Sequence, residues 1–189
     1  MHPLDFVESV IKAHREVVQA QLSVYKYHPE SLLDERIVHR VGPAELRSTY
    51  ERLSNDLRED EDIAFDSLVK VGSGDRHFAL VDFEIDEMES VEKTAEVLIS
   101  EYRAPRATLV NSGRSFHLYL AVLLSRQEWV RFMGRLLLLN ARGEQPTVDP
   151  RWIGHRLLGG FSALRWSANH HPCVPKVVRE WAERRLATR

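Results

Sequence analysis

The stretch His77-Phe-Ala-Leu-Val-Asp-Phe-Glu-Ile-Asp86 alternates acidic and apolar side chains over its second half. Side chains at positions i and i+2 of a strand point to the same face of a sheet. We therefore expect Asp82, Glu84 and Asp86 to project together, while Phe83 and Ile85 enter a core. The stretch predicts a strand that carries carboxylates on one face.

The segments around this strand predict an ordered series of strands and helices. Ser125 and Glu128 have the spacing of a capping box, which predicts the start of a further helix. The other expected elements are a strand at 63–71, a turn at 72–75, a helix at 88–103, a strand at 106–110, a turn at 111–115 and a strand at 116–124. This order is typical of an α+β domain in which helices pack against an open sheet.

The two ends of the chain are expected to be helical. Apolar residues at helical spacing predict a helix over 4–26, and a second helix should start after Pro43. We therefore expect residues 1–60 to form an N-terminal helical appendage and residues 61–189 to form the main domain. The last segments predict a short helix at 150–160, a strand at 162–166 and a basic terminal helix at 174–186.

The composition is that of an ordinary globular protein. The chain has 189 residues, of which 43% are hydrophobic and 29% are charged, which argues against a disordered or collagen-like chain. Cys173 is the only cysteine, so no intrachain disulfide can form, and we expect a reducing, cytoplasmic location. No apolar stretch approaches the roughly 20 residues needed to cross a bilayer, so we expect no membrane association.

Charge is distributed unevenly along the sequence. Residues 54–92 contain 13 acidic and three basic residues, whereas residues 150–189 contain eight basic and two acidic residues. An acidic centre beside a basic end suits a site that holds cations and binds phosphates. Charge runs of this kind also occur on ordinary solvated faces, so this observation decides nothing alone.

The carboxylates of the 77–86 stretch are the first candidate site. Carboxylates held close together repel each other unless a cation lies between them or one is protonated. Mg²⁺ and Mn²⁺ prefer oxygen ligands and would relieve this repulsion. The alternative is an amphipathic strand with a solvated acidic face.

The second candidate is the turn Asn111-Ser-Gly-Arg-Ser115 with the strand residue His117 that follows it. Backbone N–H groups in a Ser-Gly turn can form a concavity that holds a phosphate. Arg114 would add a guanidinium, and a His117 ring nitrogen could donate to a phosphate oxygen. The alternative is a simple hairpin turn with a structural histidine.

The third candidate is the stretch from Asp149 to Asn169. Asp149 could hold a cation or could cap the helix that begins at Pro150. Arg165 lies inside an apolar strand, which costs free energy unless it meets an anion or another partner. Ser167 and Asn169 could extend a phosphate or template surface. His170, His171 and Cys173 lack the paired spacing of zinc ligands, so we do not favour a zinc site there.

These three stretches, in this order, resemble the catalytic core of the archaeo-eukaryotic primase superfamily, which includes primase-polymerases. The resemblance rests on an acid-x-acid strand, a Ser-Gly-x-x-x-His-apolar-Tyr motif and a later aspartate followed by an Arg-containing strand. It covers residues 78–172. It implies an RRM-like, primase-type open sheet, mixed or antiparallel, packed by helices.

The resemblance also implies roles for individual residues. Asp82 and Glu84 would bind divalent ions, with Asp86 as an alternate to one of them, and Asp149 would be the third ligand. Ser112, Gly113, Arg114 and His117 would contact the phosphates of an incoming nucleotide. Arg165 would contact the triphosphate, and Asn169 would add to the substrate surface. The turn departs from the family where relatives often carry lysine and glycine, and the stretch from Asp149 to Arg165 is longer than expected.

The activity that this resemblance implies is nucleotidyl transfer dependent on Mg²⁺ or Mn²⁺, with nucleoside triphosphates and a DNA or RNA template or primer as partners. A second hypothesis is a catalytically weak or inactive module that binds nucleotide or nucleic acid within a larger complex. A third is a protein-interaction module that docks through residues 1–60.

Overall fold

The computed structural model describes residues 1–26, 35–168 and 173–182. Its elements are α1 (Pro3–Ala13), β1 (Val17–Lys26), β2 (Arg36–Val41), a 3-10 turn η1 (Pro43–Glu45), α2 (Leu46–Asp56), β3 (Glu61–Val71), β4 (Gly74–Asp82), α3 (Met88–Glu101), β5 (Arg106–Asn111), β6 (Phe116–Leu124), α4 (Arg126–Leu137), α5 (Pro150–Gly159), β7 (Ala163–Arg165) and β8 (Lys176–Ala182). No helix in these ranges is long and apolar enough to cross a membrane.

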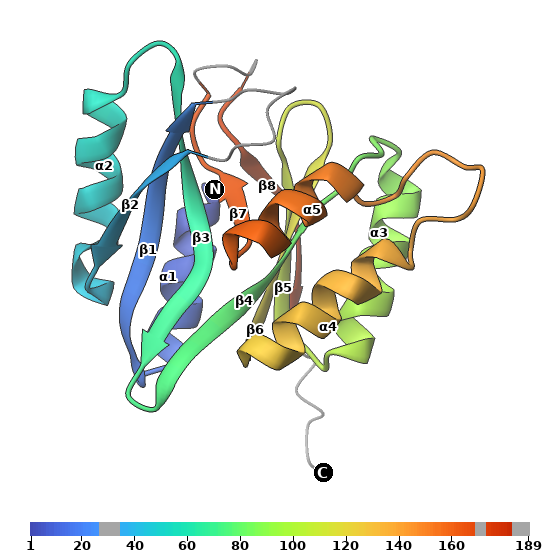
Figure 1. Ribbon diagram of the computed structural model, residues 1–189, viewed down its shortest axis with the longest axis horizontal. Helices are drawn as coiled ribbons and strands as arrows, with labels where there is room; N and C mark the ends of the chain where they lie inside the picture. Colours follow the sequence, from blue (N-terminus) through green and yellow to red (C-terminus); the bar gives the residue numbers. More distant parts are fainter. Residues whose placement is uncertain (27–34, 169–172, 183–189) are drawn as a thin grey trace.

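The strands form one open sheet in the order β2-β1-β3-β4-β6-β5-β8, and β7 pairs with β3. Every pairing between these strands is antiparallel. In Figure 1, α1 lies behind the sheet and α4 and α5 lie in front of it. The expected α+β class, with an open sheet packed by helices, is confirmed.

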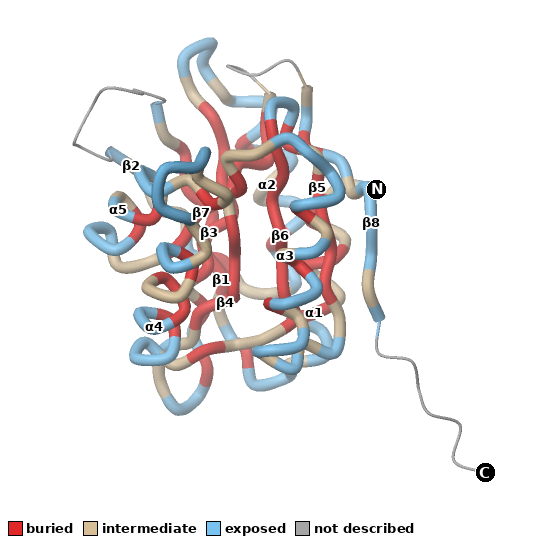
Figure 2. Tube along the Cα trace, turned by 90° about the vertical axis from the view of Figure 1, so that its right-hand side faces the viewer, coloured by how far each residue is buried: buried red, intermediate tan, exposed pale blue. Residues whose placement is uncertain are grey.

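The sheet separates two hydrophobic cores. One core joins the apolar faces of α1 and α2 to the sheet, and the other joins α3, α4 and α5 to the opposite face. Figure 2 shows that burial is concentrated in the central strands, whereas the edge strand β8 is largely exposed. The alternation of apolar side chains along the strands therefore serves two layers of helices.

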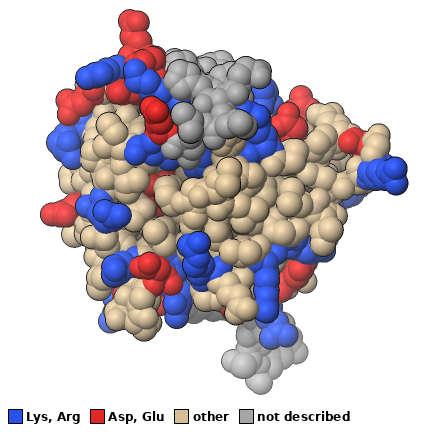
Figure 3. All heavy atoms as spheres, in the orientation of Figure 1, with Lys and Arg blue, Asp and Glu red and all other residues tan. Residues whose placement is uncertain are grey.

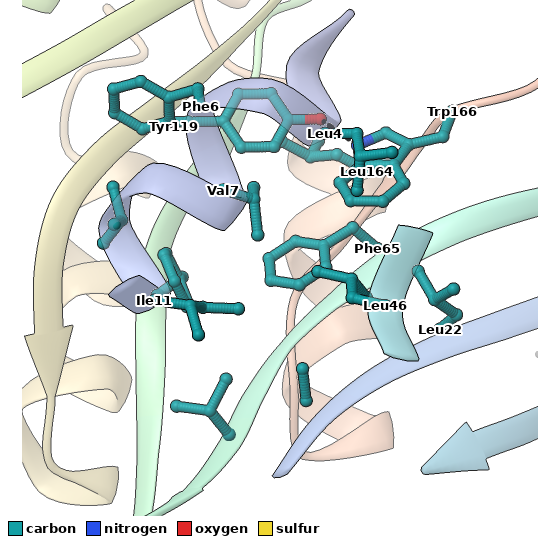
Figure 4. Close-up of a cluster of buried hydrophobic side chains, with 14 of the residues drawn as sticks. Leu4, Phe6, Val7, Ile11, Leu22, Leu46, Phe65, Tyr119, Leu164 and Trp166 are labelled. Carbon is teal, nitrogen blue, oxygen red and sulfur yellow. Dashed lines mark hydrogen bonds between the residues drawn. The ribbon is translucent and has the colours of Figure 1, made fainter. Parts of the chain in front are cut away.

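Aromatic side chains of the first core reach the strands that carry the candidate site. Trp166 stacks on Phe65 with ring centroids 5.1 Å apart, and its Nε1 donates to the hydroxyl of Tyr119 at 3.1 Å. Figure 4 shows these rings packed beside Phe6 of α1. Trp166 follows Arg165, and Tyr119 is two residues from His117, so this packing fixes the backbone on which both candidate residues are carried.

The predicted N-terminal helix is wrong beyond Ala13. Residues 17–26 form β1, which pairs with β2 on one side and β3 on the other. Ala20, Leu22 and Val24 are buried in the first core and alternate with polar residues, a period of two that the helical interpretation overlooked. The expected helical appendage over residues 1–60 is thus corrected, because β1 and β2 extend the same sheet as the following strands.

The predicted basic helix over 174–186 is also wrong within the described residues, which end at 182; residues 183–186 lie outside them. Residues 176–182 form β8, which pairs with β5 along its length. Val177 and Val178 are β-branched, which favours a strand. The backbone of β8 also gains hydrogen bonds from β5. The helix predicted after Ser125 is confirmed, with Ser125 and Glu128 forming the capping box.

Candidate active site

The first two candidate motifs meet across neighbouring strands. The register of β4 and β6 places Asp82 directly opposite His117. Nε2 of His117 lies 3.5 Å from Oδ1 of Asp82. The His117 side chain is 6% exposed and that of Asp82 is 24% exposed. The histidine and the carboxylate therefore face each other at the end of β4.

The third stretch joins them through the backbone. The amide of Asp149 donates to the carbonyl of Asp82 at 3.0 Å, and the amide of Glu84 donates to the carbonyl of Thr147 at 3.0 Å. Val148 and Phe83 form an isolated antiparallel bridge between these two bonds. This short ladder brings the backbone at Asp149 beside that at Asp82 and Glu84, although more than 60 residues of sequence separate Asp149 from them.

The carboxylates act on one another electrostatically. Burial, and after it the negative charges of Asp149 and Glu84, together raise the pKa of Asp82 from 3.8 to about 8. Arg114 and Arg165 oppose this effect. A carboxyl that resists ionisation beside two other carboxylates is the setting that a bound cation stabilises. Asp86, the alternate, is exposed beyond the end of β4.

Asp149 also caps α5, as the alternative interpretation predicted. Its Oδ1 accepts hydrogen bonds from the amides of Arg151 at 2.8 Å and Trp152 at 3.0 Å. Both bonds reach the same carboxylate oxygen. The capping role and the position beside Asp82 are therefore compatible.

The Ser-Gly turn is held by bonds within itself. Gly113 has φ 108°, a conformation that favours glycine, and its amide donates to Oδ1 of Asn111 at 2.8 Å. The amide of Ser112 donates to the carbonyl of Ser115 at 3.0 Å. These two N–H groups are thus already used within the turn. The Arg114 side chain is 75% exposed, with Nη2 3.8 Å from Oε2 of Glu84.

Arg165 is bound to backbone rather than open to solvent. Its Nη2 donates to the carbonyl of Ser112, and its Nη1 donates to the carbonyls of Ser167 and, at 3.2 Å, Cys173. The residue is 6% exposed. Because one guanidinium connects the Ser-Gly turn, the end of β7 and the segment before β8, Arg165 holds the turn in place.

Sequence reasoning missed Asp62, a buried residue close to the hydrogen bonds of Arg165. Oγ of Ser167 donates to Oδ1 of Asp62 and accepts from the amide of Ile63 at 2.8 Å. Asp62 is fully buried, whereas in the sequence it is one acid of a charged run. Its position at the start of a predicted apolar strand was the one signal that it is not solvated.

The remaining candidates contribute less to this geometry. Asn169, His170 and His171 lie outside the described residues. In residues 1–26, 35–168 and 173–182, no three His, Cys, Asp or Glu side chains gather closely enough to hold a metal ion by themselves. Mg²⁺ at phosphate-transfer sites commonly uses one or two carboxylates and takes its other ligands from water and substrate phosphates. The oxygen donors at the end of β4, with Asp82 ionising reluctantly, fit that mode of binding.

Two comparisons place the chain among known proteins. Residues 45–178 match the family described as archaeo-eukaryotic primase 1D-like. The fold is similar to that in a crystal structure of the catalytic domain of primase Repb' in complex with initiator DNA, with a TM-score of 0.55 and 13% sequence identity. The similarity covers 95% of this chain and 85% of that chain. No curated protein matches the chain.

Proposed function

The chain belongs to the archaeo-eukaryotic primase 1D-like family, and on this premise we propose that it is a nucleotidyltransferase that adds nucleotides to a DNA or RNA strand with the help of Mg²⁺ or Mn²⁺. The observation that supports the proposal is that backbone bonds join the segments of Asp82, Glu84 and Asp149, that the charges of Asp149 and Glu84 act on Asp82, and that His117 Nε2 lies 3.5 Å from Asp82. Primer, template and nucleoside triphosphate are the partners that this chemistry requires.

In this proposal Asp82 and Glu84 hold the divalent ion, and Asp149 supports them from the start of α5. When bound, the ion would lower the pKa of the attacking 3′-hydroxyl and offset charge on the leaving pyrophosphate. The α5 N-terminus adds a partial positive charge beside the carboxylates.

The opposite side of the site would bind the triphosphate. His117 Nε2, which lies 3.5 Å from Oδ1 of Asp82, donates to a phosphate oxygen. The Arg114 guanidinium is exposed and adjacent to Glu84, so it can move to the polyphosphate when substrate arrives. Arg165 acts indirectly, because it fixes the Ser112 carbonyl and thereby the turn. Catalysis of this type depends mainly on placement and electrostatics.

The test is incorporation of nucleotides on a primed template in Mn²⁺ or Mg²⁺. We expect the double variant Asp82→Asn/Glu84→Gln to lose at least 100-fold in rate, in line with the loss of one strong electrostatic contact, with an unchanged circular dichroism spectrum. Asp86→Asn is the matched control, since it removes an exposed carboxylate two residues away. Full activity in the double variant, or equal losses in the control, would contradict the assignment.

A second candidate function is nucleotide or nucleic-acid binding without turnover. It is favoured by the capping of α5 by Asp149 and by the lack of a closed three-ligand cluster in the described residues. Calorimetric titration with a nucleoside triphosphate separates the two, because binding under both metals without product formation supports the non-catalytic module. A protein partner at residues 1–60 would meet the outer faces of α1 and α2, since their apolar faces are buried.

A further inference from the structure

Asp62 is a fully buried carboxylate of β3 to which the proposed chemistry gives no role. Ile63 and Phe65 of the same strand enter the first core, so Asp62 projects to the other face of the sheet. In Figure 3, by contrast, charged side chains stand at the margins of a broad uncharged surface. A buried carboxylate costs free energy unless hydrogen bonds or an opposite charge compensate it. The surroundings of Asp62 therefore indicate what it does.

One partner of Asp62 is Ser167, which lies just beyond β7. The Ser167 hydroxyl donates to Oδ1 of Asp62 and accepts from the amide of Ile63 at 2.8 Å. On β7, Arg165 pairs with Ala64, two residues from Asp62 along β3. Directly opposed residues of antiparallel strands project to the same face. Asp62 therefore holds the end of β7 on the face to which Arg165 projects.

From Ser167 the hydrogen bonds continue through Arg165 to the Ser-Gly turn. Nη1 of Arg165 donates to the carbonyl of Ser167, and Nη2 donates to the carbonyl of Ser112. Bonds within the turn set its shape, whereas the bond from Arg165 connects the turn to β7. Asp62, Ser167, Arg165 and Ser112 thus form one connected series that ends on the side of the site proposed to bind triphosphate.

The charges of Asp62 and Arg165 also compensate each other. Asp62 is 0% exposed and Arg165 is 6% exposed. Burial raises the pKa of the Tyr25 hydroxyl; the charge of Arg36 then lowers it, that of Asp62 raises it and that of Arg165 lowers it. Tyr25 pairs with Asp62 across β1 and β3, so both charges act on one hydroxyl within a small volume. Removal of one member of such a buried pair leaves the other charge uncompensated.

We propose that Asp62 is a positioning residue for the nucleoside triphosphate, which acts through Ser167 and Arg165 to fix the direction of the Ser-Gly turn, an inference that rests on the proposed function. As a buried residue it would contact neither nucleotide nor metal. The turn leads into β6, where Nε2 of His117 lies 3.5 Å from Oδ1 of Asp82. A shift of the turn would therefore move the phosphate contacts relative to the carboxylates, and such placement governs phosphoryl transfer.

Ser167→Ala tests the proposal with a small change, because it removes one hydroxyl and leaves Asp62 and Arg165 in place. In steady-state incorporation on a primed template, the KM for the nucleoside triphosphate should rise about tenfold, which corresponds to about 1.4 kcal/mol, while kcat changes less than about twofold. A merely structural role would give a different result, since loss of folded protein lowers the apparent kcat and leaves KM unchanged.

Ser23→Ala is the matched control. The hydroxyl of Ser23 donates to Oδ1 of Asp66 at 2.7 Å, and both residues are fully buried. Asp66 lies four residues from Asp62 on the same strand, so the control removes a bond of the same kind that lies outside the series ending at Ser112. It should leave KM unchanged. An equal rise of KM in Ser23→Ala, or an unchanged KM in Ser167→Ala, would overturn the proposal.

Hydrogen exchange separates this proposal from the proposed function, because the measurement needs no activity. The amides of Ser112 and Gly113 are hydrogen bonded within the turn. They should exchange about fivefold faster in Ser167→Ala and at the wild-type rate in Ser23→Ala. Faster exchange in a protein that adds no nucleotide would refute the nucleotidyltransferase function and retain the connection from Asp62 to the turn. Incorporation by the wild type, with unchanged exchange and KM in Ser167→Ala, would refute the role of Asp62 and retain the function.

Discussion

Replacement of Asp82 by Asn should stabilise the protein at alkaline pH in the absence of divalent ions. Burial, with Asp149 and Glu84 as further causes, raises the pKa of Asp82 from 3.8 to about 8. The folded protein therefore holds a proton on Asp82 across a pH range in which the unfolded chain has lost it. Asparagine keeps the size of the side chain and removes this titration.

The sign and size of the effect follow from linkage. Because the folded state binds more protons than the unfolded state between about pH 4 and 8, wild-type stability must fall as the pH rises through this window. A shift of about four units corresponds to at most about 6 kcal/mol at about 1.4 kcal/mol per unit. The Asp82 side chain is 24% exposed, and retained hydration reduces the cost, so we expect about 2–3 kcal/mol at pH 8.5.

Urea unfolding monitored by tryptophan fluorescence measures this difference, because Trp129 and Trp166 are fully buried. Wild type and Asp82→Asn should have similar free energies of unfolding at pH 4.5 and should diverge toward pH 8.5. Addition of Mn²⁺ at pH 8.5 should stabilise the wild type and leave the variant unchanged. Asp86→Asn is the control and should follow the wild-type profile. If the free energy of unfolding of Asp82→Asn depends on pH in the same way as that of the wild type, the reasoning is refuted.

Three further predictions concern residues around the site and the core. Burial, followed by the charge of Arg126, lowers the pKa of His77 to about 4. The folded state therefore binds fewer protons than the unfolded state below pH 6.5, and stability falls as the pH falls. His77→Phe, which preserves stacking on Trp129, should remove up to about 3 kcal/mol of this loss in urea titrations at pH 4.5. Arg165→Lys should lower the free energy of unfolding by about 2–3 kcal/mol and speed hydrogen exchange at the Ser112 amide, because an ammonium cannot span three carbonyls. Unchanged exchange would show that the guanidinium does not hold the turn. Asp149→Ala should cost about 1 kcal/mol through the lost cap, whereas Asp149→Asn should keep that stability and weaken Mn²⁺ binding, which thermal melts and metal titrations measure separately.

The central strands and helices could be predicted because their signals are local. The capping box at Ser125 and the apolar stripe of α3 each lie within a few turns of helix. The Ser-Gly turn was predicted for a similar reason, since Gly113 has the positive φ that such a turn requires. The pairing of Asp82 with His117 was not local in this sense, because β4 and β6 are separated in the chain by α3 and β5.

The errors arose where distant pairing decides the structure. β1 contains apolar residues that satisfy helical spacing over part of their length, and its strand conformation depends on β2 and β3 on either side. β8 depends likewise on β5. The sequence could not show that Arg165 meets the Ser112 carbonyl, because no pattern reports the folding of a loop onto a guanidinium 53 residues away.

The geometry of Asp149 explains how one residue could cap α5 and also, on the proposed function, support the metal site. Its amide is fixed by the Asp82 carbonyl and its Oδ1 by two amides of α5, so backbone bonds set its position independently of any ion. Glu84 differs: its amide is fixed by Thr147, but its side chain is 33% exposed and lies 3.8 Å from a largely exposed Arg114. Movement of Arg114 to a triphosphate would release Glu84 toward Asp82. On the proposed function, Glu84 would then be free to ligate the divalent ion, and nucleotide binding would raise the affinity for the metal.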